Sequence, residues 1–414
     1  MNMHDKIVEE NIQSNISYED YVEIVNIAGL LIQDMIRIDP MMYASPSFED
    51  IVYYDTVELV NHQLQEVFEF DIYDYVESAT IEAMKIYHTC ISPRRSYDPT
   101  FIRSKPIIEI IKKKLHYLET VPQPDQRTDE WYYFRHKFLT ASSLWKAFGT
   151  QSSRNELIYN KCKPIDIEKY NTVNTESPMH WGQKYEDVSL NWYNNKYETK
   201  VSEFGCIPHR NINYLAASPD GINTDETSNL YGRMVEVKNI VNREITGIPK
   251  LEYWIQMQLQ MEVCELNECD FLETRFIEYE NEKLFREDGN FNKTNDGKPK
   301  GVIMFFNNDG KPLYEYMPFG ATEEEFNKWE SEMINKHANL TWVRNDFWYL
   351  DEVSCVLVLR NKLWFKHAET ILCELWRTIE HERVNGCEHR APKRRNKIQD
   401  GVPQELKCLI DISN

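Results

Sequence analysis

The chain has 414 residues, of which 42% are hydrophobic and 28% charged, a composition typical of a folded soluble protein rather than a disordered or fibrous one. No apolar run approaches the roughly 20 residues that span a bilayer, and the N-terminus lacks a basic start followed by an apolar stretch. Nine scattered cysteines without a CxxC pair favour a reducing, intracellular compartment.

The formal net charge of −20 is unevenly distributed along the chain. Residues 1–80 hold 17 acidic and two basic side chains, whereas residues 81–120 hold eight basic and four acidic ones. Because DNA responds to the local field at its binding groove, the acidic total does not exclude a nucleic-acid enzyme in the remainder of the chain.

An acidic helical domain is predicted over residues 1–95. Ser17 and Asp20 have the spacing of a capping box ahead of an apolar stretch from Val22 to Ile38. A packing or docking module is the plain interpretation. The alternative is a DNA mimic that screens the active site or binds a basic partner. Prolines and basic residues then mark a connector over residues 96–125, with a short helix around residues 112–114.

Helices and short strands alternate over residues 126–385, which predicts an α/β domain with a C-terminal extension. We expect helices near 129–138, 142–148, 178–197, 250–263, 321–337 and 361–382, and strands near 204–208, 213–217, 233–239, 271–279, 301–306 and 313–317. A basic tail follows over residues 386–414. It is typical of a solvated segment, with nuclear targeting or a phosphate contact as alternatives.

Two neighbouring segments place acidic and basic groups together. Ser218-Pro-Asp-Gly221 is a turn with Asp220 at its tip, and the strand at residues 234–239 alternates so that Glu236 and Lys238 share one face. Carboxylate and carbonyl oxygens are the ligands of Mg²⁺, which stabilises charge on an attacked phosphate and lowers the pKa of bound water. A nearby lysine can orient or deprotonate that water.

Further polar residues fit the same chemistry. On the helix at 178–197, Glu186 lies off the apolar stripe and can face the site. On the helix predicted near 250–263, which follows the strand at 233–239, three glutamines alternate with apolar residues. Gln256 or Gln258 can therefore hold a metal-bound water or the scissile phosphate. Each signal alone is an ordinary turn, solvated pair or helix surface. The ordered set on suitable elements indicates a nuclease.

At these residues the sequence resembles the YqaJ-like viral recombinase family, the lambda exonuclease branch of the PD-(D/E)XK nucleases, in the form found in large DNA viruses. The match is specific in order and spacing and covers residues 127 to about 265. It runs through Arg127–Trp131, Arg135, Thr140–Ser142, Trp181–Glu186, Ser218–Gly221, Glu236–Lys238 and Gln256–Gln258.

The resemblance implies a restriction-endonuclease-like core, in which a central mixed sheet is flanked by helices. It also implies two Mg²⁺ ions, replaceable by Mn²⁺, whose ligands are Glu186, Asp220, Glu236 and the Val237 carbonyl. Lys238 is then expected at the nucleophilic water and Gln258 at the active site. The DNA and its 5′-phosphate are expected to contact Arg135, Ser142 and Gln256.

The implied function is 5′-to-3′ digestion of one strand at double-stranded DNA ends, in viral recombination, repair or genome processing. A single-strand annealing protein is the implied partner, and the cytoplasm or virus factory of an infected cell the implied location. The acidic leader and the extension past residue 280 are absent from compact phage enzymes, so their trimeric ring is not carried over.

Two other functions remain as alternatives: a structure-selective or nicking endonuclease on the same core, and a DNA-binding module with a vestigial site. A zinc site at His381, Cys387 and His389 is disfavoured because the spacing matches no common finger. No set of cysteines brackets the core in the way an iron–sulfur cluster requires.

Overall fold

The computed structural model describes residues 16–99, 101, 107–167, 174–175 and 177–392. The basic residues Lys393, Arg394, Arg395 and Lys397 of the predicted tail lie outside these ranges. Within the described part of the chain, every helix is too short or too polar to cross a membrane.

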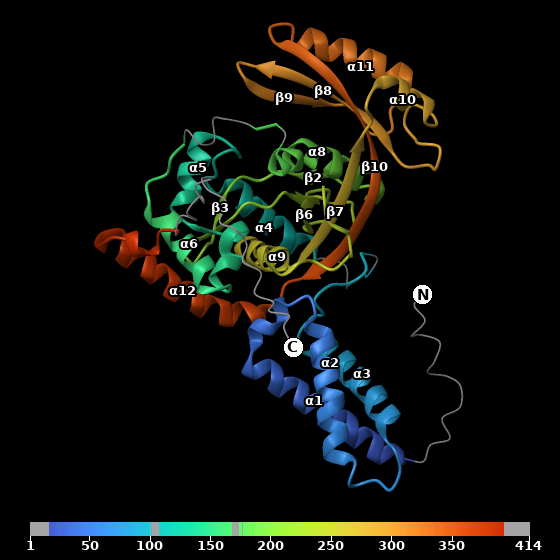
Figure 1. Ribbon diagram of the computed structural model, residues 1–414, viewed down its shortest axis with the longest axis vertical. Helices are drawn as coiled ribbons and strands as arrows, with labels where there is room; N and C mark the ends of the chain where they lie inside the picture. The colour runs from blue at the N-terminus through green and yellow to red at the C-terminus, as the bar shows by residue number, and fades with distance from the viewer. Residues whose placement is uncertain (1–15, 100, 102–106, 168–173, 176, 393–414) are drawn as a thin grey trace, which may run out of the picture.

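Three long helices form an arm that projects from the rest of the molecule (Figure 1). They are α1 (Tyr18–Ile38), α2 (Phe48–Leu64) and α3 (Tyr73–Cys90). As predicted, Ser17 caps α1, its hydroxyl accepting a hydrogen bond from the Asp20 N–H at 3.0 Å. Ile24, Ala28 and Ile32 recur at steps of four and are buried, which gives α1 the single apolar face that packs against its neighbours.

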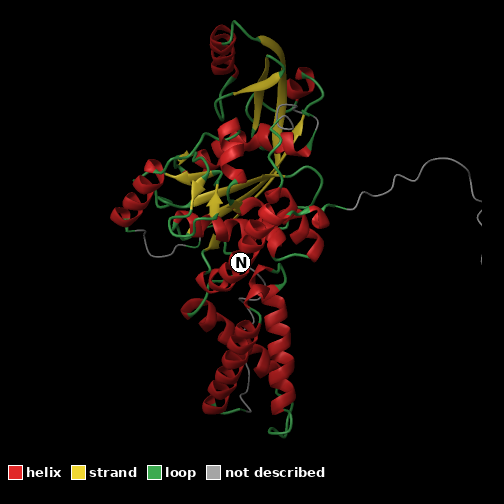
Figure 2. Cartoon of the chain, turned by 90° about the vertical axis from the view of Figure 1, so that its left-hand side faces the viewer, coloured by secondary structure: helices red, strands yellow, loops and turns green. Residues whose placement is uncertain are grey.

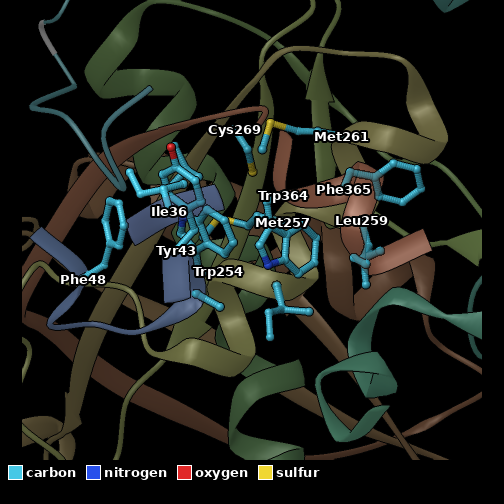
Figure 3. Close-up of a cluster of buried hydrophobic side chains, with 14 of the residues drawn as sticks. Ile36, Tyr43, Phe48, Trp254, Met257, Leu259, Met261, Cys269, Trp364 and Phe365 are labelled. Atoms are coloured by element: carbon cyan, nitrogen blue, oxygen red, sulfur yellow. The ribbon is translucent and has the colours of Figure 1, made fainter. Parts of the chain in front are cut away.

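The arm shares one hydrophobic core with the rest of the protein (Figure 3). The short helix η2 (Pro40–Ala44) carries the buried Tyr43 into a cluster with Trp254 of α9 (Leu251–Cys264) and Trp364 of α12 (Lys362–Asn385). The Trp254 Nε1–H also donates a hydrogen bond to the Arg95 carbonyl at 3.1 Å. The acidic helices are therefore anchored on α9 and α12 through η2 and the segment at Arg95.

A seven-stranded sheet with the strand order β2-β5-β6-β7-β10-β8-β9 lies between helices (Figure 2). Strands β6 and β7 are parallel, and the other neighbouring pairs are antiparallel. In chain order the strands are β2 (Val201–Ser202), β5 (Gly221–Asn223), β6 (Met234–Asn239), β7 (Glu268–Glu278), β8 (Lys300–Asn308), β9 (Lys311–Tyr316) and β10 (Thr341–Leu359).

Helices α8 (Pro178–Tyr197) and α9 cover opposite faces of the central strands. Val235 and Val237 of β6 pack with Tyr193 of α8, as their alternation predicts, whereas Met234 belongs to the cluster around α9. Helix α9 is the crossover between the parallel strands β6 and β7. The chain order α8-β2-β5-β6-α9-β7, in a mixed sheet with helices on both faces, matches the predicted PD-(D/E)XK core, and the predicted α/β class is confirmed.

A second, three-stranded sheet lies beside this core, in the order β1-β4-β3. Its strands are β1 (Leu139–Thr140), β3 (Ile207–Pro208) and β4 (Leu215–Ala217), and β1 runs parallel to β4. The helices nearby are α4 (Ile108–Thr120), α5 (Asp129–His136), η3 (Ala141–Ala147) and α6 (Gln151–Cys162), with η4 (Glu388–Arg390) after α12. The segment 142–148, predicted as an α-helix, forms the 3₁₀ helix η3.

Residues 282–349 of the extension past residue 280 form a lobe on the side opposite the arm (Figure 1), whereas α12 at its end packs on the core. Strand β10, 19 residues long, runs from beside β7 in the core to β8 in the lobe. The lobe also contains β9, α10 (Glu282–Glu287) and α11 (Glu323–Lys336). Strand β10 is not among the predicted elements, because most of its residues are exposed or half-buried and show no continuous apolar alternation.

Candidate active site

Asp220 is positioned by the pairing of β5 with β6. Gly221 pairs with Val235 in the antiparallel register, so the turn before β5 reaches the middle of β6. One Asp220 oxygen, Oδ2, accepts a hydrogen bond from the Val237 N–H at 2.8 Å. Gly221 permits the close approach of the neighbouring strand β2, because a Cβ there would lie 2.1 Å from the Val201 side chain. The aspartate therefore sits beside Glu236 on a fixed backbone.

Glu236 is fully buried and is held by three donors. Its Oε1 accepts hydrogen bonds from the Lys238 ammonium and, at 2.6 Å, from the Gln256 Nε2. Its Oε2 accepts a hydrogen bond from the Gln260 Nε2 at 2.7 Å. A buried carboxylate is costly unless it is paired and hydrogen-bonded, so these donors keep Glu236 in one orientation inside the fold.

Lys238 lies on the same face of β6 as Glu236, as the alternation predicts. Burial lowers the pKa of Lys238, but the Glu236 and Asp220 carboxylates outweigh it, and the resulting pKa lies above the ordinary value for lysine. The ammonium also lies 5.2 Å from the centre of the Tyr253 ring. A raised pKa keeps Lys238 charged, which favours orientation and charge stabilisation over action as a general base.

Glu186 reaches this cluster from α8. Its Oε2 accepts a hydrogen bond from the Arg127 Nη2 at 2.8 Å. Burial raises the pKa of Glu186, Asp187 and Glu236 raise it further, and Arg127 and Lys238 oppose the shift. Burial, together with repulsion by Glu236 and Glu186, likewise raises the pKa of Asp220 well above its ordinary value. The site therefore concentrates more negative charge than its own cations balance.

The predicted glutamines divide between two places. Gln256 and Gln260, four residues apart on α9, both face Glu236, whereas Gln258 faces away. The Gln258 Nε2 donates to the Leu359 carbonyl at 2.9 Å, and its Oε1 accepts from the Asn361 N–H at 2.6 Å. The structure thus does not bring Gln258 into the cluster. Gln260, which sequence reasoning left out, takes its place.

Arg135 and Ser142 meet beside the Asp220 turn. The Arg135 Nη2 donates to the Ser142 Oγ at 2.8 Å, and the guanidinium stacks 4.1 Å from the centre of the Trp131 ring. Strands β1 and β4 are parallel, so the segments that leave their carboxyl ends, towards Ser142 and towards Asp220, emerge at the same edge. The predicted phosphate-binding pair therefore lies on the side of the small sheet that carries the acidic cluster.

Sequence reasoning also missed the buried Lys161 of α6, whose Nζ donates to the Arg135 carbonyl at 2.9 Å. Burial lowers the pKa of Lys161 to about 7, and the neighbouring charges of Arg135 and Arg383 lower it in the same direction. No local signal distinguishes Lys161 from a surface lysine, since its burial depends on how α6 packs against α12.

The donors of the acidic cluster suit a hard divalent cation. Asp220, Glu236 and Glu186 supply carboxylate oxygens, which Mg²⁺ prefers to nitrogen or sulfur. Among the described residues, no three His, Cys, Asp or Glu side chains are arranged as a ready-made metal cage. Mg²⁺ usually keeps several waters and takes one or two protein carboxylates, so the spacing is compatible with such an ion. A cation bound at the Glu186 Oε2 would displace the Arg127 guanidinium from that oxygen.

Comparison with known proteins finds one family model and related chains. The model of the YqaJ-like viral recombinase domain matches residues 130–267. An uncharacterised protein of Acanthamoeba polyphaga mimivirus is 30% identical over an alignment of 350 residues, which covers 74% of this chain and 61% of that protein. The chain thus spans about three-fifths of the length of this relative.

Solved structures with similarity include an alkaline exonuclease, LHK-Exo, from Laribacter hongkongensis. It is 19% identical with a TM-score of 0.37, and the match covers 63% of this chain and 100% of the exonuclease. The structure of LHK-Exo in complex with dAMP matches with a TM-score of 0.36 over the same shares of both chains.

Proposed function

Since residues 130–267 match the model of the YqaJ-like viral recombinase domain, we propose that this chain is a divalent-metal-dependent deoxyribonuclease. The observation that carries the proposal is the convergence of Asp220, Glu236 and Lys238 with Glu186 of α8. Three acids and a lysine in one partly buried cluster are the groups that metal-assisted phosphodiester hydrolysis requires.

The proposed cofactor is Mg²⁺, as two ions, with Mn²⁺ as a substitute. Its ligands would be Glu186, Asp220, Glu236 and the Val237 carbonyl. When bound, the metal supplies charge neutralisation at the attacked phosphate and a water of lowered pKa. Repulsion among the carboxylates supports this assignment, because a divalent cation would relieve it.

The protein side chains would orient the reacting groups. The Val237 N–H fixes Asp220, and Gln256 and Gln260 fix Glu236, so neither carboxylate has to reorganise during the reaction. Lys238, kept charged by its acidic neighbours, would hold the attacking water and offset negative charge that develops on the phosphate.

The proposed substrate is a double-stranded DNA end, digested in the 5′-to-3′ direction. Arg135 and Ser142 would bind the 5′-terminal phosphate, since a guanidinium and a hydroxyl beside each other match phosphate oxygens. The polarity follows from the family resemblance. In a large DNA virus this activity would serve recombination, repair or genome processing, together with a single-strand annealing protein in the infected cell.

Digestion of linear duplex DNA labelled at either end, compared with a closed circle, tests the proposal. We expect Mg²⁺-dependent release of the 5′ label first, an intact closed circle, and no activity with EDTA. Cleavage of the closed circle would instead identify an endonuclease. Binding of DNA without any cleavage in Mg²⁺ or Mn²⁺ would identify a DNA-binding module with a vestigial site.

A further inference from the structure

Arg127 has a backbone conformation that arginine rarely adopts. Its φ is 67°, in the left-handed region, where a side chain normally costs about 1–2 kcal/mol relative to glycine. The turn is fixed on both sides, because the Gln126 amide donates to the Phe204 carbonyl at 2.9 Å and Thr128 caps helix α5. The fold thus holds an arginine at a position where glycine would be less strained.

The Arg127 side chain contacts Glu186, a proposed metal ligand. Its guanidinium is about half exposed and pairs with Glu186, whose own side chain is 23% exposed. Both line a pocket of about 250 Å³. Four acids line this pocket, namely Asp125, Glu186, Asp187 and Glu203. Arg127 is the cation among these lining residues, where it neutralises part of a strongly negative surface.

The Glu186 oxygen that accepts the hydrogen bond from the guanidinium cannot at the same time be a full ligand of a divalent cation. Oε2 points to Arg127, and no ready-made cage of acidic, histidine or cysteine side chains exists among the described residues. Binding of a metal at this oxygen therefore competes with the ion pair. Once displaced, a half-exposed guanidinium at the edge of an acidic site is suited to a phosphate, which it can bind with two parallel hydrogen bonds.

We propose that Arg127 is a built-in counter-ion that holds Glu186, releases it when a divalent cation binds, and then binds a backbone phosphate of the DNA. This inference rests on the proposed nuclease function and adds a regulatory contact to that site. By this exchange the arginine couples metal binding to DNA binding: each favours the state that the other requires.

Calorimetric titration of the DNA-free protein with Mn²⁺ tests the first half. The variants are Arg127→Ala and Arg127→Gly, with Lys112→Ala as the matched control, since Lys112 pairs with Glu226 at the same distance of 2.8 Å and its side chain is about as exposed as that of Arg127. Removal of a competing ion pair of ordinary strength should tighten Mn²⁺ binding about fivefold in both Arg127 variants and leave the control unchanged.

Equal Mn²⁺ affinity in the wild type and Arg127→Ala would overturn the inference. A change confined to Arg127→Gly would also overturn it, because the effect would then come from the backbone. Absence of Mn²⁺ binding by the wild type would overturn the proposed metal site itself, which distinguishes the two failures. The second half is tested by duplex binding in Ca²⁺, where we expect Arg127→Ala to bind DNA about fivefold more weakly and Lys112→Ala as the wild type does.

Discussion

Methionine substitutions at the three glutamines of α9 would separate site residues from structural ones. Methionine approximates the shape of glutamine but removes its hydrogen bonds. Gln256 and Gln260 each donate one bond to the buried Glu236 carboxylate, at 2.6 and 2.7 Å. Gln258 instead makes two bonds to the backbone where β10 meets α12. All three side chains are buried, so burial alone does not distinguish them.

The magnitudes follow from these partners. A hydrogen bond to a charged group contributes about 1.5–3 kcal/mol, so Gln256→Met and Gln260→Met should each lower the free energy of unfolding by about that amount. Gln258→Met leaves a buried N–H and carbonyl unpaired, at about 1–3 kcal/mol each. Stability should therefore fall in all three variants. Activity should fall about 10- to 100-fold in the first two, because Glu236 loses its orienting contacts.

Urea denaturation gives the stability of each variant, and initial rates on end-labelled duplex DNA give the activity per folded molecule in saturating Mg²⁺. We expect Gln258→Met to cleave as the wild type does once the folded fraction is taken into account. A loss in Gln258→Met equal to that in Gln256→Met would refute the assignment. Wild-type rates in both Gln256→Met and Gln260→Met would do the same.

Four other substitutions probe the chemistry, the phosphate contact and the buried lysine. Lys238→Ala and Asp220→Ala should each reduce cleavage at least about 100-fold with unchanged circular dichroism, and residual wild-type rates in either would contradict the proposed site. Arg135→Ala should weaken use of 5′-phosphorylated ends about tenfold or more, while equal loss on hydroxyl ends would argue against a phosphate contact. Lys161, with its pKa lowered from 10.5 to about 7, is neutral in the folded protein but charged in the unfolded chain between these values. Because the unfolded state binds more protons there, wild-type stability should rise with pH from about 7 to 10 by an amount on the order of a few kcal/mol. In Lys161→Met this rise should be smaller in denaturation curves measured across that range, and an equal rise would refute the shift.

Local rules account for the parts of the site that lie on one strand or one turn. Alternation along β6 places Glu236 and Lys238 on one face and Val235 on the other, and the structure confirms this division. The proline and glycine around Asp220 predict the turn that brings it to β6. The ordered motifs also indicated the family, because several spaced signals together are far more specific than any one of them.

The sequence by itself determined the strand that carries Glu236 and Lys238, the helices on either side and the residue types available for metal chemistry. Its spacing also put Gln256 and Gln260 on one helix face. Which face meets Glu236 was decided by how α9 packs between β6 and the arm, a contact between residues more than 200 positions apart. The Arg127–Glu186 pair has the same origin, since it joins a turn to a helix 59 residues away. Such contacts depend on burial and long-range packing, which a local periodicity does not encode.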